Sequence, residues 1–304
     1  MTVTIGGLDI GHEHHCRVIA EIGVNHNGDI DRALDLIAAA RRAGCDAVKF
    51  QKRTPHLAVP EAEWGELRDT PFGKMPKLDY RERVEFDWPD YQIIAEYCQT
   101  IGIPWFVSVW DLPSVEIMEG MECVAYKIPS ARLHDTALLR RVARTMKPLI
   151  LSTGMSTMED VETAVRTLDN TRQDKTPCFY QDLILLQCTS AYPAKAEESN
   201  LRVIQTYRET YCDMPVGFSS HKIGLQTCLL AVAAGACVIE RHITLDRAAL
   251  GSDHKMSSTP EDLARLVKEI RYAEQCLGDG VKRVYPSEEG ERKRLRGHLG
   301  MAQG

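Results

Sequence analysis

Short apolar runs alternate with longer helical patterns along most of the chain. The runs are rich in β-branched and aromatic residues, which favour strands. The stretches between them repeat apolar residues with the period of a helix, and residues 29–44 also have Asp29 as a capping residue and Gly44 as a stop. The pattern predicts eight strands, over residues 17–23, 47–51, 104–110, 123–129, 148–154, 183–189, 215–220 and 237–244.

The alternation of strand and helix predicts a parallel sheet, because parallel strands need a crossover connection. Eight such units in 304 residues favour a closed (β/α)8 TIM barrel over an open doubly wound sheet. No glycine-rich dinucleotide fingerprint or phosphate-binding loop follows a predicted strand, which also argues against the open sheet. The sequence therefore predicts an α/β protein with a catalytic barrel over residues 17–278.

Three segments lie outside the repeat. Residues 1–16 are predicted to form a short hairpin that turns at Gly6 and Gly7 and covers the N-terminal mouth of the barrel. Residues 52–88 form a long charged insertion on the face where barrels place their active sites, so they are a candidate substrate cover. Residues 279–304 form a tail with the basic run ERKRLR, interpreted as a solvated charge run, with a remnant linker as the alternative.

Polar side chains stand at the carboxyl end of every predicted strand. A TIM barrel builds its active site from these ends and fills its middle with apolar side chains. One polar strand end means little, but eight together predict an active site at this mouth. The residues are Glu21, Lys49, Gln51, Ser108, Lys127, Ser130, Ser152, Thr153, Thr189, Ser190, Ser219, His221 and His242.

Two lysines of this set, Lys49 and Lys127, suit an oxyanion. Ammonium groups with serine hydroxyls and backbone amides can bind a phosphate or a carboxylate. For either lysine alone, a solvated residue at the barrel rim is the simpler interpretation. Glu21 is the carboxylate of the first strand end and can hold a substrate hydroxyl or move a proton.

His221 and His242 end neighbouring strands and can therefore share one divalent metal. Two protein ligands leave open positions for water and substrate, as a catalytic metal site requires. A hydrogen-bonded pair of histidines without a metal is the alternative. The neighbours Glu240 and Arg241 are expected on the outside or the rim of the barrel.

The charge balance gives no reason to expect nucleic acid or an anionic membrane as a partner, because the net charge is −6 and the pI is near 6.0. The apolar stretches are too short to span a bilayer and the first twenty residues lack signal-peptide features, so a cytoplasmic location is expected. The ten cysteines are scattered singly, with no C-x-x-C pair, and are interpreted as reduced core residues.

Seven motifs follow one another at successive strand ends: AEIGVNHNGD, AVKFQ, YKIPS, LSTGMST, CTSAYP, GFSSH and IERHITLDR with a following GSD. In this order they resemble the sialic acid synthase family, whose members condense phosphoenolpyruvate with an N-acetylated hexose. The resemblance covers residues 17–278. It implies a transferase that joins phosphoenolpyruvate to an open-chain aldose and releases phosphate by C–O cleavage, leaving a 2-keto-3-deoxy acid.

The resemblance also implies a role for each matching residue. Glu21, Lys49 and Lys127 would be catalytic. Phosphoenolpyruvate would be held by Lys49, Ser108, Lys127, Ser130, Ser152 and Ser219. The sugar would meet Gln51, Arg132, Ser190, Tyr192 and Asp253. His221 and His242 would hold Mn²⁺, with Co²⁺ or Mg²⁺ as alternatives, and the metal would polarise the sugar aldehyde.

Three departures from the family pattern concern the acceptor. Arg132 stands where the family commonly has a glutamate, Ser190 stands where many members have an asparagine, and FVSVWD replaces a Ser-Thr-Pro sequence. A guanidinium makes a two-pronged contact with a phosphate or carboxylate, so Arg132 predicts an acidic or modified aldose. Pairing of Arg132 with Asp135 on the rim is the alternative.

The antifreeze-like C-terminal domain of the family is expected to be absent, which leaves a homodimer as an open question. Two other functions also stay open. One is another metal-dependent barrel aldolase or a 3-deoxy-aldulosonate-phosphate synthase. The other is a non-catalytic sugar-binding relative, against which the two histidines and two lysines argue.

Overall fold

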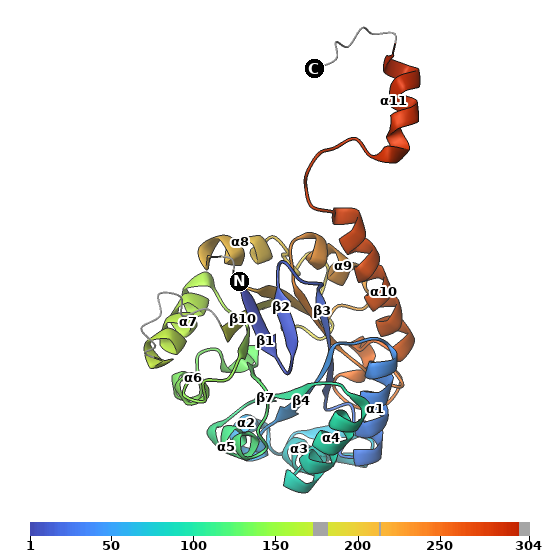
Figure 1. The fold of residues 1–304 in the computed structure, drawn as a ribbon. Helices are drawn as coiled ribbons and strands as arrows, with labels where there is room; N and C mark the ends of the chain where they lie inside the picture. Colours follow the sequence, from blue (N-terminus) through green and yellow to red (C-terminus); the bar gives the residue numbers. More distant parts are fainter. Residues whose placement is uncertain (173–181, 213, 298–304) are drawn as a thin grey trace.

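The computed structural model describes residues 1–172, 182–212 and 214–297. Eight parallel strands close into a barrel in the order in which they follow one another along the chain (Figure 1). This order results because each parallel strand is joined to its neighbour by a crossover connection. The strands are β3 (Arg17–Gly23), β4 (Ala47–Lys52), β7 (Trp105–Val109), β8 (Tyr126–Ile128), β9 (Leu149–Ser152), β10 (Leu183–Cys188), β11 (Val216–Ser220) and β12 (Val238–His242).

One longer helix follows each barrel strand and forms part of the outer ring. The predicted TIM barrel is therefore confirmed. Predicted and observed strand ends differ by a few residues; the fourth strand, predicted over 123–129, is only Tyr126–Ile128. The helices are α1 (Ile30–Arg42), α4 (Trp88–Ile101), α5 (Leu112–Gly120), α6 (Thr136–Ala143), α7 (Met158–Arg172), α8 (Val203–Thr210), α9 (Gln226–Ala233) and α10 (Pro260–Leu277).

Local signals explain where α1 begins and ends. The side chain of Asp29 accepts a hydrogen bond from the backbone N–H of Arg32, so it satisfies one of the free donors of the first turn. Gly44 follows the helix with φ +85°, a left-handed conformation that favours glycine. Both ends agree with the sequence prediction.

The N-terminal hairpin closes the bottom of the barrel. Strands β1 (Thr2–Ile5) and β2 (Leu8–Gly11) pair antiparallel, and Gly6 and Gly7 form the turn with positive φ. Val3, Ile5 and Ile10 are buried and belong to the main hydrophobic core. A Cβ on Gly6 would lie 2.9 Å from Pro104 Cβ, next to the start of β7, so the hairpin packs against the N-terminal ends of the strands, as predicted.

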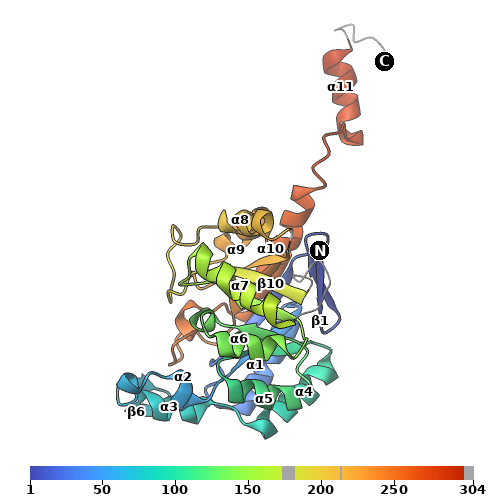
Figure 2. The same cartoon turned by 90° about the vertical axis from the view of Figure 1, so that its left-hand side faces the viewer.

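The insertion after β4 forms a small substructure of its own. It contains α2 (Pro55–Ala58), a 3-10 turn over Glu61–Glu63, the antiparallel pair β5 (Leu67–Thr70) and β6 (Gly73–Pro76), and α3 (Lys77–Val84). Figure 2 shows α2, α3 and β6 gathered together at one end of the molecule. Because it follows the carboxyl end of β4, this substructure lies on the catalytic face.

The tail leaves the barrel after α10 and carries a 3-10 turn over Pro286–Glu288 and the short helix α11 (Glu289–Arg296) (Figures 1 and 2). Residues 275–297 are all exposed, which agrees with a solvated charge run. Across the described residues, no helix is long and apolar enough to cross a membrane.

The cysteine prediction is wrong for two residues. Cys212 and Cys276 are exposed, because they lie at a helix end and near the end of α10 rather than in strands. The other seven described cysteines are buried and unpaired, as predicted, and Cys178 lies outside the described residues.

Candidate active site

The carboxyl ends of the strands surround a cavity of about 220 Å³. Most of the predicted site residues meet there, although they come from all parts of the sequence. Lys49, Arg132 and Asp253 do not line this cavity directly, and their places are given below. The predicted residues on the cavity wall are Glu21, Gln51, Ser108, Lys127, Ser130, Ser152, Ser190, Tyr192, Ser219, His221 and His242.

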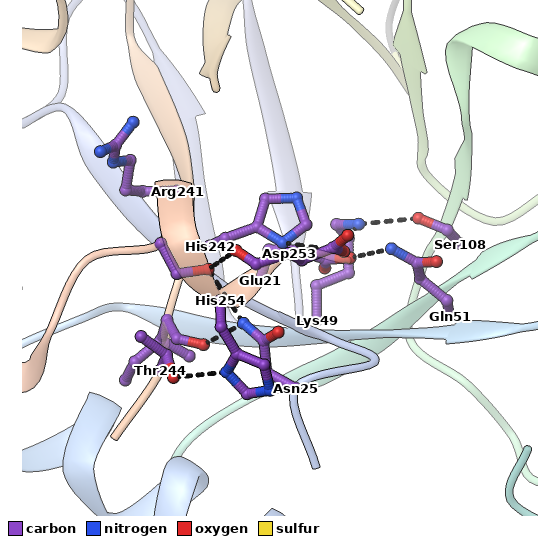
Figure 3. A network of polar contacts seen from close by, with 12 residues as sticks. Glu21, Asn25, Lys49, Gln51, Ser108, Arg241, His242, Thr244, Asp253 and His254 are labelled. Carbon is purple, nitrogen blue, oxygen red and sulfur yellow. Dashed lines mark hydrogen bonds and ion pairs between the residues drawn. The ribbon is translucent and has the colours of Figure 1, made fainter. Parts of the chain in front are cut away.

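Lys49 lies at the base of the site and is 1% exposed, so its charge needs partners inside the protein. Its Nζ atom lies 2.6 Å from Glu21 Oε2 and 2.7 Å from Ser108 Oγ (Figure 3). A second carboxylate oxygen, Oε2 of Glu240, is 3.6 Å away. Lys49 therefore joins strands β3, β4, β7 and β12 through one ammonium group.

The rim position expected for Glu240 from the sequence is wrong. It is 2% exposed and faces the cavity, not the rim. Its Oε1 atom accepts a hydrogen bond from Ser219 Oγ at 3.0 Å and lies 3.3 Å from Lys127 Nζ. The signal was present, because residues two apart on a strand share a face, so Glu240 had to point the same way as His242.

Arg241 points the other way, toward the outer face of β12 (Figure 3). It is 1% exposed and lies among the loops behind the strand. Its guanidinium donates to Ser258 Oγ at 2.9 Å and to the carbonyl oxygen of Ser220 at 3.0 Å. The predicted outside position of Arg241 thus holds, and its role there is to tie loop backbone to the barrel.

The two lysines and two carboxylates set one another's charge. Burial raises the pKa of Glu21 and lowers that of Lys49, and each of these shifts is only partly offset by the other residue of the pair. Burial also raises the pKa of Glu240, but Lys127 and Lys49 outweigh it and hold that pKa below its usual value. Glu240 is therefore the fixed anion of the site, and Glu21 is the carboxylate better able to carry a proton.

His221 and His242 face each other above this group, with ring centroids 5.5 Å apart. Tyr192 covers them, because its ring lies 4.1 Å from that of His221 and 6.4 Å from that of His242. Burial lowers the pKa of His221 to about 3 and that of His242 to about 4. Both imidazoles are therefore neutral near pH 7.

The pair fits a divalent metal on three observations. Nδ1 of His221 lies 2.8 Å from the carbonyl oxygen of Thr189, which fixes the ring with Nε2 free. Nδ1 of His242 is buried without a hydrogen-bond partner, with Asp253 Oδ2 3.6 Å away. Neutral imidazoles are the form that binds metals. The described residues hold no group of three or more histidine, cysteine or acidic side chains placed to bind a metal.

Gln51 links the site to Arg53, which follows β4 at the start of the insertion. Its Nε2 donates to Glu21 Oε1 at 2.6 Å, and its Oε1 accepts a hydrogen bond from Arg53. The guanidinium of Arg53 lies over the ring of Trp110, with 4.6 Å between Cζ and the ring centroid. Trp110 also lines the cavity, so this side of the pocket is built from the ends of β4 and β7.

The opposite wall is made of small polar groups. Ser130 Oγ accepts a hydrogen bond from the backbone N–H of Gly154 at 3.0 Å. A Cβ on Gly154 would lie 2.4 Å from Ser190 Oγ and 2.9 Å from Ser130 Oγ, so any other residue there would displace these hydroxyls. Ser152 Oγ is buried on the cavity wall and has no hydrogen-bond partner among the described residues. This free hydroxyl and Lys127 provide donors for an oxyanion.

The loop after β3 is fixed to the end of β12 by the first sequence motif. Asn25 Nδ2 donates to the carbonyl oxygen of Ile243 at 2.7 Å and to Ser257 Oγ at 2.9 Å. Behind it, Thr244 Oγ1 and His254 Nδ1 lie 2.7 Å apart (Figure 3). These bonds hold the loop that carries Asp253, so Asn25 supports the site from behind, whereas Glu21 of the same motif lines the cavity.

Arg132 lies on the rim in a 3-10 turn over Ser130–Arg132. Its guanidinium donates to the carbonyl oxygen of Leu57 in the insertion at 3.0 Å and lies 3.9 Å from Asp135. In this position Arg132 does not reach the cavity. It could contact the sugar only through the insertion or after its side chain turns.

The fold and the polar strand ends together define a TIM-barrel enzyme with its active site at the carboxyl ends of the strands. Comparison with known proteins gives the family. The model of the NeuB family matches residues 36–282. N-acetylneuraminate-9-phosphate synthase of Mus musculus is 35% identical over 292 residues, which are 93% of this chain and 77% of that protein.

Two further relatives agree. N,N′-diacetyllegionaminic acid synthase of Legionella pneumophila is 35% identical over 282 residues, which cover 91% of this chain and 78% of that protein. The crystal structure of N-acetylneuraminic acid synthetase from Leptospira borgpetersenii in complex with citrate has a TM-score of 0.87 at 30% identity. That match covers 99% of this chain and 98% of the other.

The chain therefore belongs to the NeuB family. The predicted resemblance is confirmed, and the protein is an enzyme of the sialic acid synthase type. The roles given to single residues stay predictions, and they are taken up as proposals below.

Proposed function

We propose that the enzyme condenses phosphoenolpyruvate with an open-chain N-acetylated aldose to give a 2-keto-3-deoxy acid and phosphate. One observation carries the proposal. Lys127, Ser152 and Ser219 face the same small cavity as two neutral histidines, so an anionic donor and a carbonyl acceptor can be held side by side. Family membership supports it, because relatives bear the names of sialic and legionaminic acid synthases.

Phosphoenolpyruvate is assigned to the cationic half of the cavity. Lys127 and Lys49 supply positive charge, and Ser108, Ser130, Ser152 and Ser219 supply hydroxyl donors. In the free enzyme, Glu240 lies 3.3 Å from Lys127 Nζ and 3.6 Å from Lys49 Nζ, and Glu21 lies 2.6 Å from Lys49 Nζ, so two carboxylates offset the two lysines. We propose that the phosphate and carboxylate of phosphoenolpyruvate accept hydrogen bonds from the N–H and O–H groups of these lysines and serines that are still unpaired.

The reaction forms one carbon–carbon bond and breaks one carbon–oxygen bond. Carbon 3 of phosphoenolpyruvate attacks the aldehyde carbon, and the aldehyde oxygen takes up a proton to become a hydroxyl. Water adds to carbon 2 and loses one proton, which leaves a hydroxyl group there. This hydroxyl then gives its own proton to the departing phosphate as the bond between carbon 2 and the phosphate oxygen breaks, and carbon 2 becomes a ketone. Glu21 is proposed to supply the proton to the aldehyde oxygen, because burial raises the pKa of this carboxyl.

His221 and His242 are proposed to hold a divalent metal, Mn²⁺ or else Co²⁺ or Mg²⁺. When bound, such an ion would polarise the aldehyde as a Lewis acid. Tyr192, Gln51 and Ser190 line the cavity beside these histidines and are proposed to orient the sugar. Asp253 is proposed to steady His242 from 3.6 Å away and to face the acceptor.

The test is a screen of aldoses with phosphoenolpyruvate, read out by release of inorganic phosphate and by mass of the keto acid. We expect equal amounts of phosphate and acid with at least one N-acetylated aldose. Lys127→Met is the negative control, because it removes one positive charge at the phosphoenolpyruvate site and should abolish both products. Absence of phosphate release with every aldose would contradict the proposal. The screen is needed because relatives at the same identity carry the names of different acid synthases.

A further inference from the structure

A buried arginine lies directly behind the two histidines of the site. Arg241 is 1% exposed, and its side chain leaves β12 on the face opposite to that of His242 (Figure 3). In the described part of the chain, its guanidinium forms no ion pair with a carboxylate, and its hydrogen bonds go to hydroxyl and carbonyl oxygens. A buried cation costs free energy even where it is hydrogen-bonded, so its presence at this place calls for a function.

His221 lies just beyond the sheet, where strand pairing no longer fixes the backbone. Strand β11 ends at Ser220, and the last residue pair of its ladder with β12 is Ser220 and Arg241. The Nη1 atom of Arg241 donates to the carbonyl oxygens on both sides of the histidine. The distances are 3.0 Å to Ser220 and 2.5 Å to Lys222. One nitrogen thus holds the backbone that carries His221, while the carbonyl oxygen of Thr189 holds its ring.

The other nitrogens of the same guanidinium hold the loop after β12. Arg241 Nε donates to Ser258 Oγ at 2.9 Å, and Nη2 donates to the carbonyl oxygen of Met256 at 3.3 Å. The backbone N–H of Ser258 in turn donates to the carbonyl oxygen of His242 at 2.8 Å. The same loop carries Asp253, whose Oδ2 atom lies 3.6 Å from His242 Nδ1. The guanidinium therefore joins the segments that carry both histidines and this carboxylate.

We propose that Arg241 is a positioning residue that sets the placement of His221 relative to His242, and thereby the affinity and coordination geometry of the metal that the two histidines hold. The inference rests on the proposed function, because the metal belongs to that function. Two ligands from different strands bind one ion well only if their separation is fixed in advance. A guanidinium suits this task, because it is planar and donates in several fixed directions at once.

The experiment measures binding of Mn²⁺ to the protein after removal of metal with a chelator, by isothermal titration calorimetry. For Arg241→Met we expect Kd to rise by about tenfold or more, the order found when groups that orient metal ligands are removed. Arg241→Lys keeps the charge but loses the planar fork, so the rise in Kd should be smaller. The absorption spectrum of bound Co²⁺ should change in both variants, because it reports the arrangement of ligands around the ion.

Binding of phosphoenolpyruvate separates a positioning role from a merely structural one. The metal-free Arg241→Met and wild-type proteins should bind phosphoenolpyruvate with the same Kd, because its assigned ligands Lys127 and Ser152 lie on β8 and β9, away from the guanidinium. A merely structural role would weaken the binding of phosphoenolpyruvate as much as that of the metal. Circular dichroism checks that each variant is folded.

Arg271→Gln is the matched control. Arg271 in α10 donates to the carbonyl oxygen of Cys16 and pairs with Glu274, at the end of the barrel where β3 begins. Its loss removes a comparable set of contacts but should leave the Kd for Mn²⁺ and the Co²⁺ spectrum unchanged.

Ser258→Ala is the milder variant, because it removes one hydrogen bond of the guanidinium and keeps its charge. It should raise the Kd for Mn²⁺ by about threefold. If Arg241→Met does not fold, Arg241→Lys and Ser258→Ala decide the question. An unchanged Kd for Mn²⁺ in Arg241→Met, or in both of the other variants, overturns this inference and leaves the proposed function intact. A wild type that binds no metal would overturn this inference together with the metal assignment of the proposed function.

Discussion

Lys127 on β8 and Glu240 on β12 meet across the barrel, with 3.3 Å between Nζ and Oε1. The two residues are 113 positions apart in the chain, and their strands lie on opposite sides of the closed sheet. The same carboxylate also lies 3.6 Å from Lys49. One buried anion thus holds two buried cations in place before a substrate arrives.

The first prediction concerns this anion. Glu240→Gln removes the shared counter-charge but keeps an acceptor for Ser219, so the free energy of unfolding should fall by about 3 kcal/mol at pH 7. Urea denaturation measures the change.

Phosphoenolpyruvate should stabilise the Glu240→Gln variant more than the wild type, because the negative charge of phosphoenolpyruvate replaces the lost carboxylate. Glu197→Gln, an exposed control, should change stability by less than about 0.5 kcal/mol. Equal stability of Glu240→Gln and wild type would contradict the role assigned to Glu240.

The second prediction concerns bond cleavage. Phosphoenolpyruvate labelled with ¹⁸O at the oxygen between carbon 2 and phosphorus should deliver the label to inorganic phosphate. Mass spectrometry of both products measures this. The reason is that Lys49, Lys127 and the serines are arranged to hold the phosphate oxyanion while its bond to carbon 2 breaks. Label found in the keto acid would show P–O cleavage and exclude the proposed chemistry.

The third prediction concerns the metal. Dialysis against a chelator should abolish turnover, and Mn²⁺, Co²⁺ or Mg²⁺ should restore it. His221→Ala and His242→Ala should each lose bound metal, measured by elemental analysis, while keeping the circular dichroism spectrum of the wild type. His134→Ala is the control, because His134 is exposed, lies next to Asp160 and lines no part of the cavity. Full activity in a metal-free preparation would rule out the metal.

The fourth prediction concerns pH and stability. His26 stacks on Phe86 with 3.9 Å between ring centroids, and its Nδ1 accepts a hydrogen bond from the backbone of Gly28. Burial lowers the pKa of His26 from 6.5 to about 3. A lowered pKa means that the unfolded chain binds a proton first as pH falls, so stability present above pH 6.5 is lost progressively down to pH 3.

His26→Gln should remove this contribution. Between pH 6 and pH 4, the slope of unfolding free energy against pH should become shallower than in the wild type by up to about 1.4 kcal/mol per pH unit. Denaturant titrations at several pH values measure the slope. The variant will be less stable at pH 7, because it also loses the stacking on Phe86, so the comparison is between slopes. Parallel curves would show that His26 does not titrate as stated.

The fifth prediction concerns Arg132. Arg132 is engaged with Leu57 and Asp135 on the rim, so Arg132→Ala should lower the unfolding free energy by less than about 1 kcal/mol. It should also leave the ratio of kcat/KM for anionic and neutral acceptors unchanged, measured by steady-state kinetics. A changed ratio in Arg132→Ala would restore the sugar-binding role predicted from the sequence.

Periodicity alone determined the architecture of this protein. Eight strand patterns, each followed by a helical pattern, leave few arrangements that bury both faces of every strand, and a closed parallel barrel is the one that suits this length. The same reasoning placed Lys49, Lys127, His221 and His242 at one mouth, because the carboxyl ends of parallel strands lie on one side. Capping residues such as Asp29 fixed helix ends for local reasons that sequence shows directly.

Tertiary structure decided which groups touch. Strand alternation could have placed Glu240 inside, but only the closed sheet shows that its carboxylate reaches Lys127 across the barrel. The insertion has no repeat to interpret, so the hydrogen bond from Arg132 to the carbonyl oxygen of Leu57 followed from its folding. The physical reason is the range of the interactions. Turns, caps and strand faces depend on neighbours along the chain, whereas buried charges are settled by whichever partners the completed fold brings within a few ångströms.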